Sequence, residues 1–317
     1  MIHSFTVQNQ QLLEVTDNHE SFWLHVEQPT HEEIQQLIAT YKFPKDYLTA
    51  VLDDAENSRS EGLHQTAFKK SILLLLQFPY KTISSSGYLQ FETFPLSIII
   101  TPNRQIITVT NKSLPFLEEL KERPFVQNDM NNKMNLLLSI LWQVVTTFNR
   151  YLDLLKKELN DLEQQIQVST ENKQLFQIMN IQKSLVLFDA ATTANLVTLS
   201  ELEKTTFIQE NHAYSNHLHD VVVETKQATT SANIHLKFAT QMNNTFTSVV
   251  SNNLNNVMKI LTSLTIVLTI PTIIGGVFGM NVALPFAKSE NAFLIITGIT
   301  IFLCYLVIRI LKKKNLL

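Results

Sequence analysis

The fold of this chain is decided by residues 251–281, SNNLNNVMKILTSLTIVLTIPTIIGGVFGMN. No charged side chain occurs between Ile260 and Met280. At a rise of ~1.5 Å per residue, this run is long enough to cross the ~30 Å hydrocarbon layer of a membrane as a helix. A second apolar run, residues 292–311, follows closely. The two runs predict transmembrane spans at about 260–280 and 292–311.

The polar and small residues of the first span share one helix face. Steps of three and four residues, the spacing of a heptad seam, relate Asn255, Met258, Thr262, Thr265, Thr269, Thr272, Gly276 and Gly279. Such residues can pack helices together or bond back to carbonyls of their own helix. The stripe also continues through Ser251, Ser248 and Asn244, which favours several copies of the helix around an aqueous axis. Because one chain supplies only two spans, a channel requires an oligomer.

The tripeptide Gly279-Met280-Asn281 ends the first of two C-terminal spans and follows the segment NNVMKILTSLT. This arrangement resembles the CorA metal-ion transporter family. In that family the first span lines the pore of a homopentamer, and the Gly-Met-Asn motif forms the outer mouth that receives hydrated Mg2+. The resemblance implies a divalent-cation channel that moves Mg2+, with Co2+ and Ni2+ as further candidate ions, and that is gated by intracellular Mg2+.

Composition and motifs narrow the functional class. With 317 residues, 45% hydrophobic content and a net charge of -3, the chain can bury a large core and lacks the charge of a nucleic-acid binder. The single cysteine, Cys304, excludes an internal disulfide and a cysteine-based zinc site. No phosphate loop, G-x-S-x-G or H-E-x-x-H motif occurs, so we expect neither an enzyme nor an organic cofactor. The N-terminal MIHSFTVQNQQ lacks the apolar core of a secretory signal.

Residues 1–128 predict a cytosolic α/β domain. The pair Thr30 and Glu33 forms a T-x-x-E capping box, which opens a helix that ends near Lys42. Pro44 precedes a second expected helix, and this helix carries Asp53, Asp54 and Glu56. Strands are expected at 12–15, 22–26, 71–80, 88–94, 96–101 and 105–110.

Residues 129–257 predict a stalk of long helices, since neither glycine nor proline occurs from 131 to 270. Helices at 131–168 and 170–212 form an expected antiparallel pair joined near Ser169. A third begins near Ser215 and runs into the first span. Its apolar positions follow heptad-like steps, which favours a stalk of parallel copies: Leu218, Val222, Ala232, Leu236, Ala239, Phe246 and Val250. The fold class is therefore an α+β membrane protein, with a transmembrane domain at 258–317.

Charge at the ends of the second span predicts the topology. The span finishes with Arg309 and the triplet 312–314, all lysine, whereas the loop 282–291 carries only Lys288 against Glu290. By the positive-inside rule, both termini lie in the cytosol and the loop lies outside the cytoplasmic membrane. The expected partners are further copies of the chain, the lipid bilayer and divalent cations.

The chemistry of Mg2+ suggests roles along the stripe. The ion keeps several waters, so neutral oxygens that bind those waters suit its passage. The amide of Asn281 and the carbonyls of Gly279 and Met280 fit this role, although Asn281 could equally be a helix cap and Gly279 a packing residue. The hydroxyls of Thr262, Thr265, Thr269 and Thr272 and the amide of Asn255 line the deeper path, with Gly276. Met258 and Leu261 could form an apolar ring that closes the pore by dewetting.

Regulation and the choice of ion leave alternatives open. Counting back from Asn281 places Asp220 on an acidic stalk position that the family uses to sense cytosolic Mg2+, with Glu224 one turn later; both could instead be solvated surface. The related ZntB branch moves zinc, and His212, His217 and His219 lie near Asp220. A ZntB-like zinc transporter is therefore one alternative. A membrane-anchored adaptor that transports nothing is the other.

Overall fold

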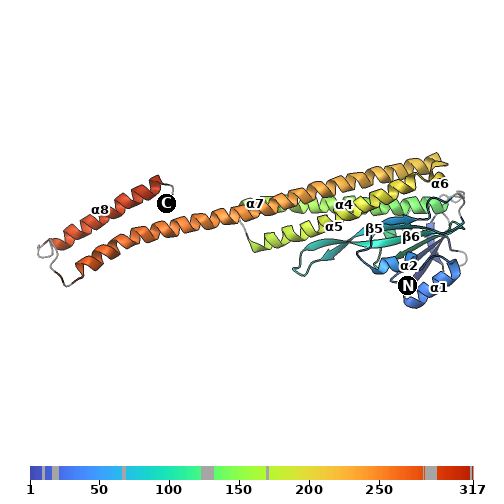
Figure 1. Ribbon diagram of the computed structural model, residues 1–317, viewed down its shortest axis with the longest axis horizontal. Helices are drawn as coiled ribbons and strands as arrows, with labels where there is room; N and C mark the ends of the chain where they lie inside the picture. The colour runs from blue at the N-terminus through green and yellow to red at the C-terminus, as the bar shows by residue number, and fades with distance from the viewer. Residues whose placement is uncertain are drawn as a thin grey trace. The chain divides into compact units, whose positions relative to one another are not determined.

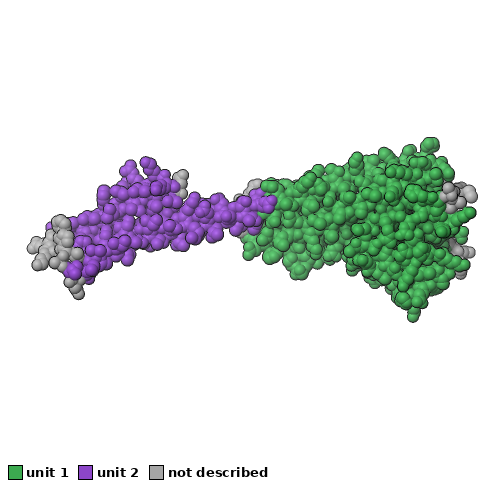
Figure 2. Space-filling view, viewed as in Figure 1, with its two compact units in different colours: residues 1–243 green, residues 244–317 purple. Residues whose placement is uncertain are grey.

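The computed structural model describes residues 1–8, 11–15, 21–65, 69–122, 132–168, 171–280, 282, 291–314 and 316. Two compact units are present, Met1–Asn243 and Asn244–Leu317, which Figure 2 colours separately. The first unit combines a β-sheet with helices. The second consists of helix alone among the residues described.

A seven-stranded sheet forms the middle of the first unit (Figure 1). Its strands are β1 (Ile2–Gln8), β2 (Gln11–Val15), β3 (Trp23–Glu27), β4 (Arg59–Glu61), β5 (Ile72–Ile83), β6 (Leu89–Ile100) and β7 (Ile106–Thr110). They lie in the order β2-β1-β3-β7-β6-β5-β4, and only β3 and β7 pair in parallel. Strand β7 thus lies between the three N-terminal strands and the β5–β6 hairpin.

Strand β6 runs through a proline that the sequence suggested as a break. The expected strands 88–94 and 96–101 form one strand, with Pro95 opposite Gln77 of β5. Strand β7 pairs with β6 only from Leu96 to Ile100, so the missing N–H of Pro95 interrupts no bond between these two strands.

One face of the sheet is covered by α1 (His31–Tyr41), α2 (Asp46–Thr49) and the 3-10 turn η1 (Ala50–Leu52). The predicted capping box is confirmed: Glu33 N–H donates to Thr30 Oγ1 at 3.2 Å, and Thr30 N–H donates to Glu33 Oε2 at 2.8 Å. Helix α1 ends at Tyr41, and its C-cap residue Lys42 adopts a left-handed φ of 55°. Side chains of these helices form one buried cluster with the sheet, including Leu37, Leu48, Leu73 and Ile99.

The prediction of a helix that carries Asp53, Asp54 and Glu56 is wrong, because the helical turns end at Leu52. Asp53 is extended, with φ −102° and ψ 106°. Its Oδ1 accepts a hydrogen bond from Ala55 N–H at 3.0 Å. This local hydrogen bond from backbone to side chain stabilises a non-helical turn, which competes with continuation of the helix.

The opposite face of the sheet carries α4 (Asn132–Val168) and α5 (Asn172–Glu203), which lie side by side and antiparallel (Figure 1). Phe91 of β6 packs against them, with ring centroids 4.7 Å from Tyr151 and 5.8 Å from Phe188. The antiparallel pair is confirmed, although the expected junction at Ser169 lies outside the described residues. A short helix, α3 (Leu117–Lys121), precedes the pair.

The second helix of the pair ends earlier than the sequence suggested. Helix α5 stops at Glu203 rather than near 212, and α6 (Thr206–Gln209) follows before α7 (His212–Phe278) begins. Thr205 is extended, and its hydroxyl donates to the carbonyl of Leu202 at 2.6 Å. This side chain satisfies one of the last carbonyls of α5.

The first part of α7 packs within its own unit along a buried heptad seam that includes Leu218, Val221, Thr225, Ala228, Ala232 and Ala239. Asn149 of α4 donates to Glu224 at 2.9 Å, and Gln182 of α5 donates to Thr240 at 3.2 Å. The residues that cover these apolar positions of α7 therefore belong to the same chain. Val250, which shares the spacing, is exposed.

Three of the described helices are long and apolar enough to cross a membrane: α5, α7 and α8 (Ala292–Lys313). The apolar window of α5 is 44% buried against its own unit, whereas those of α7 and α8 are 6% buried. Helix α5 is therefore a core helix, and the apolar surfaces of α7 and α8 are the ones left uncovered.

Candidate ion pathway

Helix α8 packs on one face of the C-terminal half of α7. Ser263 is 1% exposed and its hydroxyl donates to the carbonyl of Leu316 at 2.7 Å. Residues at steps of three and four along the same face are half-buried: Lys259, Val267, Ile270 and Ile274. We did not identify this face from the sequence. The signal was Ser263, the one hydroxyl of the span that lies off the threonine stripe.

The predicted stripe points away from that contact. Every member is exposed within the single chain: Asn255, Met258, Thr262, Thr265, Thr269, Thr272, Gly276 and Gly279. With ~100° between successive residues, the centre of this threonine face lies roughly 140° around the helix from the face that meets α8. Leu261 is exposed beside it. The structure therefore brings the predicted pore-lining residues together on a surface that α8 leaves open.

Three threonines of this face use their hydrogen atoms inside the helix. The hydroxyls of Thr265, Thr269 and Thr272 donate to carbonyls one turn earlier, at 2.9, 2.7 and 3.0 Å. A hydroxyl that donates in this way keeps lone pairs for accepting hydrogen bonds. The face therefore presents acceptors, which suit the outward-pointing hydrogens of water bound to a cation.

Pro271 lies inside α7 and cannot donate to the helix ladder. The carbonyl left without that donor belongs to Val267, four residues earlier. Cys304 Sγ of α8 lies 3.9 Å from this carbonyl and can donate a weak bond to it. The single cysteine thus lies at the contact between the two apolar helices.

The end of α7 lies at the expected tripeptide. The N–H of Gly279 donates to Gly275 at 2.9 Å, and that of Met280 donates to Val277 at 3.3 Å. A Cβ on residue 279 would lie 3.1 Å from the oxygen of Gly275, which is a tight approach. Asn281, the third member of the motif, lies outside the described residues.

The predicted regulatory carboxylates lie on the part of α7 that belongs to the Met1–Asn243 unit. Asp220 is exposed, whereas Glu224 is half-buried and accepts the bond from Asn149. The histidines are not brought together: His219 pairs with Glu203 at 2.8 Å, and the ring of His217 lies edge-on to Trp142 at 6.0 Å. Within the described part of the chain, no three His, Cys, Asp or Glu residues form a group able to hold a metal ion.

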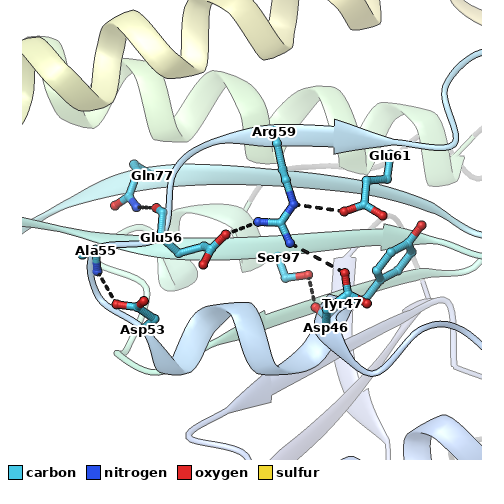
Figure 3. A network of polar contacts seen from close by, with 9 residues as sticks. All are labelled: Asp46, Tyr47, Asp53, Ala55, Glu56, Arg59, Glu61, Gln77 and Ser97. Carbon is cyan, nitrogen blue, oxygen red and sulfur yellow. Dashed lines mark hydrogen bonds and ion pairs between the residues drawn. The ribbon is translucent and has the colours of Figure 1, made fainter.

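A single arginine pairs with one acid of α2 and with two acids that follow it (Figure 3). Arg59 pairs with Glu56, donates to Glu61 at 3.0 Å and lies 3.8 Å from Asp46. Partial burial disfavours the charged guanidinium, but the hydrogen bonds and charges of Glu61 and Glu56 outweigh it and raise the pKa of Arg59. Glu56 therefore already has a cationic partner within the chain.

Comparison with known proteins gives the same architecture. The cobalt/magnesium transport protein CorA of Methanocaldococcus jannaschii is 24% identical over 181 residues, and the match spans 57% of each chain. The complete structure of the CorA magnesium transporter from the same organism superposes with a TM-score of 0.76 at 20% identity, covering 98% of this chain and 96% of that one.

Two further structures share the fold at 12% identity. The full-length CmaX protein gives a TM-score of 0.72 and covers 98% of this chain and 97% of its own. The ZntB cytoplasmic domain from Vibrio parahaemolyticus gives 0.58, with 80% and 97% covered. The predicted fold class is thus confirmed. A family model described as CorA-like Mg2+ transporter protein matches residues 18–313, and the chain therefore belongs to that family.

Proposed function

We propose that copies of this chain form a homopentameric channel for divalent cations in the cytoplasmic membrane, with the α7 helices around the ion path and both termini in the cytosol. Mg2+ is the proposed cargo, with Co2+ and Ni2+ as further candidates. The curated relative carries both magnesium and cobalt in its name. The function proposed is transport rather than catalysis.

The observation that carries this proposal is the exposed threonine face of α7 opposite the α8 contact. Hydroxyls that bond back to their own helix can also lie against lipid or another helix. Asn255 distinguishes these surroundings, because a primary amide cannot satisfy its two donors and its acceptor by itself. Among the described residues, no hydrogen bond to its side chain is recorded, and the face continues through exposed Ser251. Water supplies the missing partners at Asn255, and we propose that it follows the same face into the span along a shared axis.

The proposed path has three parts. Gly279, Met280 and Asn281 receive the hydrated ion at the outer mouth. Thr262, Thr265, Thr269 and Thr272 accept hydrogen bonds from its water shell, beside the open surface of Gly276. At the inner end, Asn255 adds an amide ring, and Met258 and Leu261 supply an apolar ring that closes by dewetting.

Regulation by internal Mg2+ is proposed for Asp220, helped by Glu224. Exposed carboxylates from neighbouring subunits repel one another unless a divalent cation lies between them. Asp220 is available for this role because it is exposed. Glu224 is less available, since its carboxylate already accepts a bond from Asn149.

Mg2+ uptake into liposomes that contain the purified chain tests the proposal. We expect wild type to admit Mg2+ and Asn281→Ala to lose most of this flux. Asn291→Ala is the matched control, because Asn291 precedes α8 and makes no side-chain capping bond there. Zinc uptake without Mg2+ uptake would replace the proposal with the zinc-transporter alternative. No flux of either ion would favour the adaptor.

A further inference from the structure

A cavity of about 180 Å³ lies in the Met1–Asn243 unit, far along the sequence from the apolar spans. It is bounded by the turn between β6 and β7, the start of α4 and the corner between α6 and α7. Its apolar lining comes from Ile100, Ile106, Met134, Leu137 and Phe207. None of these residues belongs to the proposed ion path.

Two cationic side chains line the same cavity. Arg104 is placed by a tight turn, where it adopts a left-handed φ of 60° and its N–H donates to the carbonyl of Thr101 at 2.7 Å. Lys133 lies in the first turn of α4, and its Nζ donates to the carbonyl of Asn103 at 3.2 Å. The two charges therefore converge from separate elements.

The two cations lack a counter-ion in the part of the chain that the structure describes. No recorded ion pair includes Arg104 or Lys133, although Glu210 also lines the cavity. Partial burial and the charge of Arg104 lower the pKa of Lys133, which is the sign of a cation held near another without compensation. An anion between them would relieve this repulsion.

The size of the cavity limits what that anion can be. A cavity of about 150 Å³ lined by apolar side chains holds a benzene ring. The present cavity has room for such a body plus a small polar head. A carboxylate matches the fork of an arginine and the point charge of a lysine.

We propose that this cavity binds a small organic anion, a carboxylate on a compact apolar body of about the size of benzoate. The carboxylate lies between Arg104 and Lys133, and the apolar body contacts Met134, Leu137 and Phe207. The inference is independent of ion transport, because it concerns residues that the proposed function does not use.

Calorimetric titration of the full chain in detergent micelles tests this inference, with sodium benzoate as the probe and benzamide as its neutral isostere. We expect saturable binding of benzoate and none of benzamide. Because a hydrogen bond to a charged group contributes about 1.5–3 kcal/mol, Arg104→Gln and Lys133→Gln each weaken binding roughly tenfold or more. Lys183→Gln, an exposed cation on α5, binds as wild type does.

Thermal unfolding of each variant shows whether it is folded before titration. Absence of saturable benzoate binding by the folded wild type overturns the inference. So does equal binding of benzamide, or unchanged affinity in both folded variants of the cation pair. None of these outcomes depends on whether the chain moves Mg2+.

Discussion

At the residue scale, one side-chain amide of α5 continues a sheet where a strand stops. Strand β4 pairs with β5 only at Leu73–Leu75, which leaves the backbone of Gln77 beyond its end. Asn195 Nδ2 donates to the carbonyl of Gln77 at 2.8 Å, and Gln77 N–H donates to Asn195 Oδ1 at 2.9 Å. Asn195 is 1% exposed, so these backbone groups have little access to water.

The first prediction concerns this amide. Asn195→Leu keeps a similar volume but leaves two buried backbone groups without partners, each at a cost of about 1–3 kcal/mol. We expect the free energy of unfolding to fall by about 2–6 kcal/mol, measured by denaturant titration of the full chain in detergent. Thr193→Ala, at an exposed position of the same helix, is the control. A loss no larger than that of the control would show that the pairing contributes nothing.

His25 of β3 is a second residue with a measurable consequence. It is fully buried, its Nδ1 lies 2.9 Å from Thr108 Oγ1, and its Nε2 has no hydrogen-bond partner among the described residues. Burial, followed by the charges of His3, Lys121 and the N-terminal amine, lowers the pKa of His25 from 6.5 to about 3. The ring is therefore neutral in the folded protein at physiological pH.

The second prediction is the resulting pH dependence. Between pH 6.5 and 3, His25 binds a proton in the unfolded chain but not in the folded one. The free energy of unfolding therefore falls as the pH falls through this window. From pH 7 to pH 5 this residue lowers the free energy of unfolding by about 2 kcal/mol. His25→Phe removes that part of the pH dependence, measured by unfolding wild type and variant at both values. Identical pH dependence in the two proteins would contradict the assignment.

At the element scale, the first part of α7 buries a stripe of small residues within its own unit. Ala228, Ala232 and Ala239 are fully buried along the seam. Heptad spacing predicts that such a stripe is covered, but it does not identify the covering helix. Here that stripe is covered inside the chain, whereas the threonine face further along α7 is exposed.

The third prediction follows from this packing. Ala232→Leu inserts extra carbon atoms into a filled contact, which commonly costs about 1–3 kcal/mol. Gln227→Leu makes a comparable substitution at an exposed position of α7 and should change the free energy of unfolding by less than about 0.5 kcal/mol. Denaturant unfolding of both variants checks the difference. Equal stability of the two would show that α7 is not closely packed at Ala232.

Local signals decided which elements could be predicted from the sequence. The start of α1 followed from Thr30 and Glu33, because a capping box lies within one turn of the helix. The end of η1 was missed because Asp53 bonds to its own turn, a choice that composition does not reveal. Pro95 suggested a break, yet β6 continues because its neighbour β7 ends at Thr110, opposite Leu96.

At the scale of the whole molecule, the two apolar helices and the threonine face followed from charge-free runs and residue spacing. The hydrogen bond from Ser263 to the carbonyl of Leu316, beyond the end of α8, did not, because a single hydroxyl in a span does not identify its partner. The cavity at Arg104 and Lys133 is lined by three elements that are distant in sequence, so no local sequence pattern could predict it. The number of subunits depends on contacts between chains and remains a prediction of the family resemblance.

The central claim is that the threonine face of α7 borders the path of the ion. Thr269 and Ile270 are neighbours about 100° apart around the helix, the first exposed on the threonine face and the second half-buried on the face toward α8. The measurement compares Thr269→Cys and Ile270→Cys in a Cys304→Ser background. Mg2+ uptake into liposomes is recorded before and after a charged, water-soluble thiol reagent. The account predicts that the reagent stops uptake through Thr269→Cys and leaves Ile270→Cys unchanged. Uptake through Thr269→Cys that persists at full modification, or equal inhibition of both variants, would contradict it.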